Sequence, residues 1–367
     1  MIKEQKVPAI NSIQVIRGLA CVLVVLHHGG ENTKIIFDIP FLFDFFKFGY
    51  AALDIFFVLS GFIITYTSMP HIGEKENLGN FLKRRFVRIY PIYWLIISGF
   101  LVVQALVPAY YKTLYPLEFS TLLSTYLILP QHIMVNGVSW SLTYEIFFYL
   151  LFPMAFLIKS KKLLVVILSV CTLSLLIFTL FFSANVEMGK VLFLVAFPMN
   201  IEFLMGVFAA ILYTHIPPKY SVHYIITGLV LFCIGSALIN YDLNMMRLLV
   251  NRIFYFGIPS MLIIMGVAVF ESNGKTKKFP RILIDLGDAS YSLYLLHLPV
   301  LVALLKIVQM KGITNAVLIQ VLLVVFIIAI CFGSILFYKK VERPLVRRIN
   351  RLLHAKSSTK YRKEQNK

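Results

Sequence analysis

The sequence predicts an all-α integral membrane protein that crosses the bilayer about ten times, with both termini in the cytosol. Of its 367 residues, 59% are hydrophobic and 14% are charged, and the mean hydropathy is +0.83. A soluble domain carries about 25% charged residues, so this composition excludes a soluble protein. Apolar runs of about 20 residues recur along the whole chain, and this is the length that an α-helix needs to span the hydrocarbon core.

Ten apolar runs predict the spans in order. They cover residues 13–28, 49–68, 90–107, 139–158, 163–183, 189–213, 223–240, 252–271, 288–309 and 314–337. With the N-terminus placed in the cytosol, most of the 35 lysines and arginines fall on the cytosolic side. Cytoplasmic loops of membrane proteins carry such an excess. The net charge of +18 therefore reflects membrane topology, and we expect no nucleic-acid partner.

Two segments are expected not to cross the membrane. A short apolar stretch near 121–136, interrupted by Pro130, is expected to re-enter or lie on the outer surface. A crossing there would place the lysines of 159–162 on the outer side. Residues 345–367 form a basic tail, which we expect in the cytosol against anionic lipid. The chain therefore divides into a membrane domain, 1–344, and this tail.

Arg17 and His28 lie at the two ends of the first apolar run, with no other charge between Gly18 and His27. Eleven residues are close to three helical turns, so the two side chains share one face, about 16 Å apart along the axis. Ionisable groups inside a membrane helix are costly, and such groups usually have a function. The alternative is that each side chain reaches to its nearer membrane surface, and this helix alone favours neither interpretation.

The predicted topology places Asp54 and Glu145 in the outer half of the membrane, at a depth similar to that of His28. A carboxylate beside a histidine orients the ring and stabilises its protonated form, which is a general-base arrangement. We therefore predict His28, Glu145 and Asp54 as catalytic residues. Both carboxylates could instead stabilise helices by hydrogen bonding, and this alternative is stronger for Asp54.

Arg85 and Arg88 lie three residues apart on one helical face, at the inner end of the predicted third span, and Arg17 lies at the same depth. Each guanidinium can bind two phosphate oxygens, so three of them at one inner mouth predict a phosphate-binding site. The alternative is ordinary cytoplasmic charge without a ligand. Arg17 favours the site because it interrupts an apolar run.

Further polar side chains inside the predicted spans are candidates for additional site positions. They are Trp140, Ser141, Glu202, Tyr294 and His297. Glu202 and the polar band before His297 also fit a simpler interpretation, in which they hydrogen-bond neighbouring helices. The chain contains no H-E-x-x-H sequence and no paired Cys/His spacing. We therefore expect no metal and no permanently bound cofactor.

Six elements, in order along nearly the whole chain, resemble those of the membrane acyltransferase-3 family, the O-acyltransferases of bacterial surface polysaccharides. They are the R-x10-H pair Arg17–His28, GYAALDIFFVLSGF (49–62), RRFVRIYPIYW (84–94), VSWSLTYEIFFYLLFP (138–153), LGDASYSLYLLHLPV (286–300) and VERP (341–344). Ala52 stands where the family usually has glycine and Leu53 where it often has valine. Neither change removes a reactive group.

The resemblance implies transfer of an acyl group, usually acetyl from acetyl-CoA, to a sugar hydroxyl. It implies that Arg17, Arg85 and Arg88 hold the CoA phosphates on the cytosolic side and that His28 is the general base. Glu145, with Asp54, would orient His28. The amino-acid sequences of the fourth and fifth elements are most similar to those of exopolysaccharide acetyltransferases. The implied acceptor is a polysaccharide or its lipid-linked precursor, handled at the bacterial plasma membrane in association with polysaccharide synthesis machinery.

Two other function classes fit the same residues. A transporter or flippase for an anionic lipid-linked saccharide precursor would use inward arginines and intramembrane acids without making a bond. A structural scaffold of a synthase complex would need none of Arg17, Arg85 or His28 individually. The agreement between the arginine–histidine spacing and the family resemblance favours the enzyme.

Overall fold

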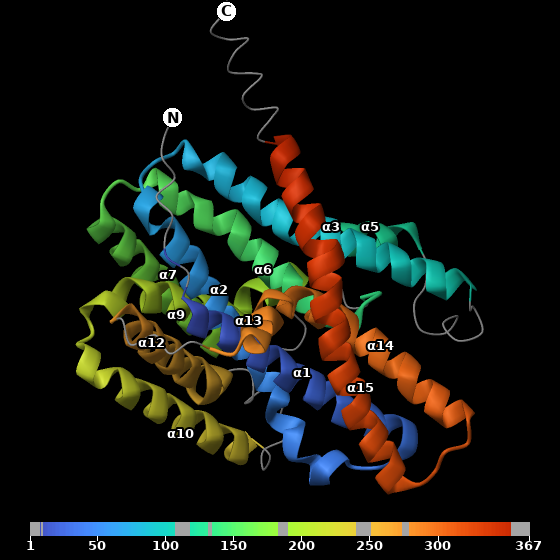
Figure 1. The fold of residues 1–367 in the computed structure, drawn as a ribbon. Helices are drawn as coiled ribbons and strands as arrows, with labels where there is room; N and C mark the ends of the chain where they lie inside the picture. Colours follow the sequence, from blue (N-terminus) through green and yellow to red (C-terminus); the bar gives the residue numbers. More distant parts are fainter. Residues whose placement is uncertain are drawn as a thin grey trace, which may run out of the picture.

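The computed structural model describes residue 8 and residues 10–106, 118–130, 134–182, 190–239, 251–273 and 279–353. These residues form helices and connecting turns and contain no strand, so the predicted all-α fold is confirmed (Figure 1). Nine helical stretches of the described chain are long and apolar enough to span a membrane: Asn11–Phe37, Phe41–His71, Asn77–Leu106, Gly137–Leu157, Lys161–Phe181, Pro218–Leu238, Ile253–Ser272, Ser290–Met310 and Ala316–Leu353.

The longer elements follow one another along the chain. They are α1 (Asn11–Phe37), η1 (Phe41–Ala51), α2 (Ala52–Ser68), α3 (Asn77–Leu106), α5 (Phe119–Leu127), α6 (Trp140–Leu151), α7 (Lys161–Phe182), α8 (Lys190–Ala196), α9 (Met199–Leu212), α10 (Ser221–Ile239), η7 (Ile253–Gly257), α12 (Ile258–Ser272), α13 (Arg281–Asp288), α14 (Ser290–Met310), α15 (Ala316–Phe337) and η8 (Tyr338–Glu342). The one-turn helices are η2 (Met69–His71), η3 (Gly137–Ser139), η5 (Tyr213–His215) and η6 (Pro218–Tyr220), and η4 (Phe152–Leu157) continues α6.

Helix α1 is the centre of the bundle and packs against η1, α2, α12, α13, α14 and α15 (Figure 1). Its contact with α13 is very close. A Cβ on Gly287 would lie 2.0 Å from the carbonyl oxygen of Gln14, and a Cβ on Gly18 would lie 2.9 Å from the Gly287 nitrogen. Glycine at both positions lets the two backbones touch, and this sets the start of α14 beside the first turns of α1.

The predicted span at 189–213 is broken into α8 and α9. The break falls at Phe197–Pro198. Pro198 has no N–H to donate, and the amide of Asn200 donates instead to the carbonyl oxygens of Leu194 at 2.6 Å and Val195 at 2.8 Å. Broken membrane helices are tolerated where side chains satisfy the freed carbonyls in this way.

The segment near 121–136 contains α5, whose nine residues extend only about 14 Å and so cannot span the membrane, as the sequence predicts. It lies beside α3, whose side chains bind its carbonyl oxygens (Figure 1). Tyr93 Oη donates to the Thr125 carbonyl at 2.9 Å, and Trp94 Nε1 donates to the Tyr126 carbonyl at 2.9 Å. Residues 131–133 lie outside the described chain.

The helix of α15 continues through the π-helical turn η8 as far as Leu353. The first part of the predicted basic tail, 345–353, therefore extends the last membrane helix without a break at 344–345. Residues 354–367 lie outside the part of the chain that the structure describes.

Candidate active site

A pocket with a cavity volume of about 90 Å³ lies among α1, α2, α3, α6 and α14. Three arginines from two helices line it, Arg17 on α1 and Arg85 and Arg88 on α3. The convergence that the sequence predicts for these side chains is therefore present in the structure. The polar remainder of the lining consists of Ser60, Ser141, Glu145, Tyr149, Ser290, Tyr291 and Tyr294.

Arg17 is held by neutral groups. Its Nη2 donates to Ser290 Oγ at 2.8 Å, and its Nη1 donates to Gln14 Oε1 at 3.0 Å. The close α1–α13 contact brings Ser290 to this position. Because both acceptors are uncharged, the guanidinium is fixed in direction while its charge stays available to a ligand.

Arg85 and Arg88 share one face of α3. The guanidinium carbon of Arg85 lies over two rings, 5.1 Å from the Phe81 centroid and 5.3 Å from the Tyr149 centroid. Its Nε is buried and has no hydrogen-bond partner among the described residues. Within the described lining of the pocket, Glu145 is the only carboxylate. Three cations against one anion make the pocket a site for an anionic ligand.

Glu145 lies in this arginine pocket and not beside His28. It accepts a hydrogen bond from Tyr149, one turn further along α6. Its depth differs from the predicted depth because the chain enters the bundle before it becomes helical. The side-chain amide of Asn136 donates to the Leu295 carbonyl at 2.9 Å, so α6 begins beside the second turn of α14. Counting residues from a surface entry therefore placed Glu145 too near the outside.

Asp54 forms a buried two-point ion pair with Arg252 and makes none with His28 among the described residues. Arg252 Nε donates to Oδ1 at 3.0 Å and Nη2 donates to Oδ2 at 2.6 Å. Asp54 is fully buried and Arg252 is 7% exposed. Glu202 is fully buried next to the pair. This geometry favours the structural alternative for Asp54, in which it joins α2 to the start of η7.

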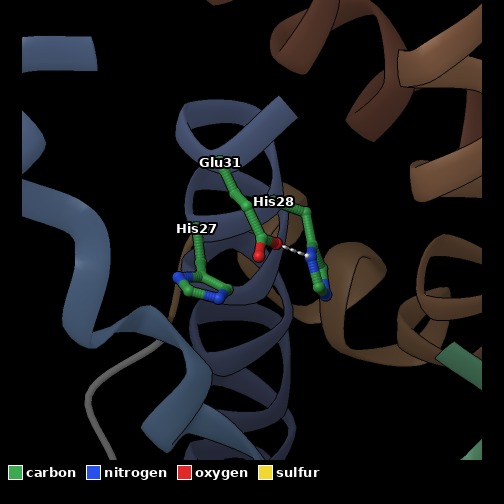
Figure 2. Close-up of side chains that lie close together, drawn as sticks. All are labelled: His27, His28 and Glu31. Atoms are coloured by element: carbon green, nitrogen blue, oxygen red, sulfur yellow. Dashed lines mark hydrogen bonds and ion pairs between the residues drawn. The ribbon is translucent and has the colours of Figure 1, made fainter. Parts of the chain in front are cut away.

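His28 has a different carboxylate partner, Glu31, which the sequence interpretation missed. His28 Nδ1 and Glu31 Oε2 are 3.2 Å apart on the same helix (Figure 2). When Nδ1–H donates to Glu31, Nε2 carries the lone pair of a general base. The spacing of His28 and Glu31 could have indicated this contact from the sequence, because residues three apart on a helix are neighbours.

The remaining predicted positions lie mainly along α14. His297 is fully buried, its Nδ1 donates to the Tyr294 carbonyl at 2.8 Å, and its ring centroid is 5.4 Å from that of His28. Tyr294 lines the pocket, and its hydroxyl lies 2.8 Å from that of Ser141. Tyr294 and His297 thus connect the pocket to His28. Trp140 packs against aromatic rings and is not part of the pocket lining.

Comparisons with known proteins identify the family of the chain. A family model described as an acyltransferase domain, acyltransferase 3, matches residues 10–338. The exopolysaccharide production protein ExoZ of Rhizobium meliloti is 26% identical over 358 residues, which cover 88% of this chain and 95% of ExoZ. Acyltransferase MdmB of Streptomyces mycarofaciens is 30% identical over 123 residues, or 31% of this chain and 30% of MdmB.

A third relative is YrhL of Bacillus subtilis, provisionally named a peptidoglycan O-acetyltransferase. It is 24% identical over 336 residues, which cover 83% of this chain and 51% of YrhL. No solved structure matches the chain significantly. The family model covers most of the chain, including the arginine pocket and His28, and the chain therefore belongs to the acyltransferase-3 family of multi-pass membrane acyltransferases.

Proposed function

We propose that this protein transfers an acyl group, most simply acetyl, from cytosolic acyl-CoA to a hydroxyl of a cell-surface or exported polysaccharide or its lipid-linked precursor. The observation that carries the proposal is the pocket in which Arg17, Arg85 and Arg88 converge, with His28 further along the helix that carries Arg17. One helix thus joins an anion site to a histidine–carboxylate pair.

The pocket suits the phosphate-bearing end of acyl-CoA. Guanidinium groups bind phosphate oxygens in pairs. In this proposal the arginines face the cytosol, both termini lie on that side, and the pantetheine arm extends from the arginines past Tyr294 toward His28. His28 lies about 16 Å along α1 from Arg17. CoA is a substrate here, not a resident cofactor.

The chemical step is direct transfer. His28 Nε2 accepts the proton of the acceptor hydroxyl as its oxygen attacks the thioester carbonyl, so that a C–O bond forms and the C–S bond breaks. The imidazolium then gives this proton to the departing thiolate, which yields the ester and free CoA. Glu31 holds Nδ1–H and stabilises the imidazolium between these two events, as a carboxylate does for a catalytic histidine.

The names of two relatives support a saccharide acceptor. ExoZ is named for exopolysaccharide production and YrhL for O-acetylation of peptidoglycan. We place the reaction at the bacterial plasma membrane, where such acceptors are assembled or exported and where a polysaccharide synthesis machinery would supply them.

The decisive experiment measures transfer of isotope-labelled acetyl from acetyl-CoA to the host's surface polysaccharide in membranes that contain wild type or His28→Ala at matched expression. His71→Ala is the control, because His71 Nδ1 also lies 3.1 Å from a glutamate three residues later, Glu74, away from the pocket. We expect labelled polysaccharide with wild type and with His71→Ala, and none with His28→Ala.

Two outcomes would contradict the proposal. Label with His28→Ala at the wild-type level would remove His28 from the reaction. No label with any protein, together with movement of unmodified saccharide across the membrane, would indicate a transporter. In that case His28→Gln should keep most of the transport, because transport needs no base.

A further inference from the structure

Three potential metal ligands meet at the end of α1 away from Arg17. His27, His28 and Glu31 each bring one nitrogen or oxygen within 4.8 Å of the other two. Figure 2 shows the Glu31 carboxylate between the two imidazole rings. The nearest basic residue along α1, Lys34, pairs with Asp44 at 3.7 Å, so it does not neutralise this group.

The fold holds each ring from a different side. Segment η1 covers His27, with the Tyr50 ring edge-on to His27 at 5.7 Å. A Cβ on Gly49 would lie only 2.8 Å from the His27 Cβ, so η1 lies directly against this histidine. The His28 ring packs on His297, at 5.4 Å between centroids. Rings fixed in this way lose little freedom on binding an ion, which favours a preorganised site.

We infer that His27, His28 and Glu31 form a binding site for a divalent transition-metal ion of the Zn²⁺ type. Two imidazoles and a carboxylate are a ligand set that suits Zn²⁺. Zn–N and Zn–O bonds of about 2.0–2.2 Å place neighbouring tetrahedral ligands about 3.3 Å apart. The 3.2 Å between His28 Nδ1 and Glu31 Oε2 already fits that separation. Three protein ligands leave the fourth position to water.

An ion bound at this site would prevent His28 from acting as the general base. When His28 Nδ1 coordinates the ion, the ring keeps its proton on Nε2, and Nε2 can no longer accept the proton of a hydroxyl. Metal binding and general-base catalysis therefore exclude each other, and the ion is an inhibitor of acyl transfer. This consequence rests on the proposed function, whereas the metal site itself does not.

The sequence analysis predicted no metal because the three ligands do not follow a familiar metal motif. They read His-His-x-x-Glu within a single apolar helix, and adjacent residues on a helix point about 100° apart. The contact forms because the carboxylate of Glu31, one turn later, returns between the two rings (Figure 2).

The first test is metal binding to the full-length protein, purified in detergent, treated with chelator and titrated with Zn²⁺ without acyl-CoA or acceptor. We expect one site per chain that His27→Gln and Glu31→Gln each weaken at least tenfold. Glu74→Gln is the matched control, because it alters the His71–Glu74 pair, which has no third potential ligand within reach in the part of the chain that the structure describes. Co²⁺ should give the visible absorption of a tetrahedral ion with wild type and with Glu74→Gln.

The proposed site would be wrong if wild type did not bind Zn²⁺, or if His27→Gln bound Zn²⁺ as strongly as wild type. The second test measures acetyl transfer with rising Zn²⁺, each protein compared with its own metal-free rate. Zn²⁺ should inhibit wild type, chelator should restore the rate, and His27→Gln should need at least ten times more Zn²⁺. Acceleration by bound Zn²⁺ would overturn the inhibitory role. Failure of the proposed function alone would leave the binding result intact.

Discussion

Ser290 accepts a hydrogen bond of 2.8 Å from Nη2 of Arg17, and this bond joins residues 273 positions apart in the sequence. It fixes the direction of one of three arginines in the pocket. The hydroxyl supplies no charge, so it positions the guanidinium without competing with an anionic ligand for it. The bond links the first helix of the chain to the start of α14, at the pocket that the proposed acyl-CoA would enter.

Ser290→Ala is expected to weaken donor binding. A hydrogen bond to a charged group contributes about 1.5–3 kcal/mol, so the KM for acyl-CoA should rise about tenfold or more while kcat changes less. Steady-state kinetics at varied acyl-CoA measures this. The control is Ser98→Ala, which removes a hydroxyl bonded to Tyr126 outside the pocket. Equal KM values for the two variants would contradict the positioning role.

Arg88→Ala should raise the KM for acyl-CoA more strongly than Arg88→Lys, because lysine keeps the charge and loses the two-point geometry. We expect a rise of at least tenfold for alanine and a smaller one for lysine. The exposed Lys83, on the same helix, provides the control Lys83→Ala. A result in which Lys83→Ala has the same effect would show that general positive charge, and not the pocket, attracts the donor.

Glu31→Gln and Glu145→Gln should affect different kinetic constants. Glu31 contacts His28, so its loss should lower kcat about tenfold or more with little change in the KM for acyl-CoA. Glu145 lies among the arginines, so its substitution should act mainly on that KM. Kinetics with both substrates varied separates the two. The opposite pattern would restore the sequence hypothesis that Glu145 orients the base.

Asp54→Asn should lower stability by about 3–5 kcal/mol, because it removes the carboxylate that forms the two-point ion pair with the buried Arg252. The double variant Asp54→Leu with Arg252→Met should recover much of this loss. Thermal unfolding in detergent provides the measurement. Asp44→Asn, which disrupts the partly exposed pairs with Lys34 and Lys47, should cost less than about 1 kcal/mol. If Asp54→Asn had wild-type stability and lost only kcat, Asp54 would instead be a catalytic residue.

Gly287→Ala should reduce both stability and activity. The added methyl group would meet the Gln14 carbonyl at 2.0 Å, so α13 must move away from α1 and take Ser290 away from Arg17. The melting temperature and the KM for acyl-CoA should both report the change. Gly99→Ala, where no atom lies within 4 Å of the new Cβ, should leave both near wild type. Normal donor binding by Gly287→Ala would show that the pocket tolerates this displacement.

The sequence was sufficient for the parts of the molecule that depend on local pattern. Hydropathy located the spans, apart from the break before Pro198 that Asn200 stabilises. Helical spacing predicted that Arg85 and Arg88 share a face, and the charge that interrupts the first span identified Arg17. Each of these depends on residues close together in the chain.

Long-range pairing could not be predicted in the same way. Arg252 lies 198 positions from Asp54, and nothing in either local sequence shows that they meet. Glu145 was placed too near the outside because hydropathy does not reveal a non-helical entry into the bundle. Glu31 is different, since its spacing from His28 was visible and its place after the apolar run led it to be overlooked. The roles of all these side chains in the reaction remain predictions.

Because Arg17 and His28 belong to one unbroken helix, α1 would set the distance that the proposed acyl-CoA donor has to span. Its length is set by backbone geometry, at about 16 Å between the two residues, and loop motion cannot shorten it. Acetyl phosphate carries the same two functional groups as acetyl-CoA, an anion and an activated acyl carbon, but only one bridging oxygen atom separates them. Such a donor could occupy the arginines or approach the imidazole, never both, and the rigid helix would reject it by length alone.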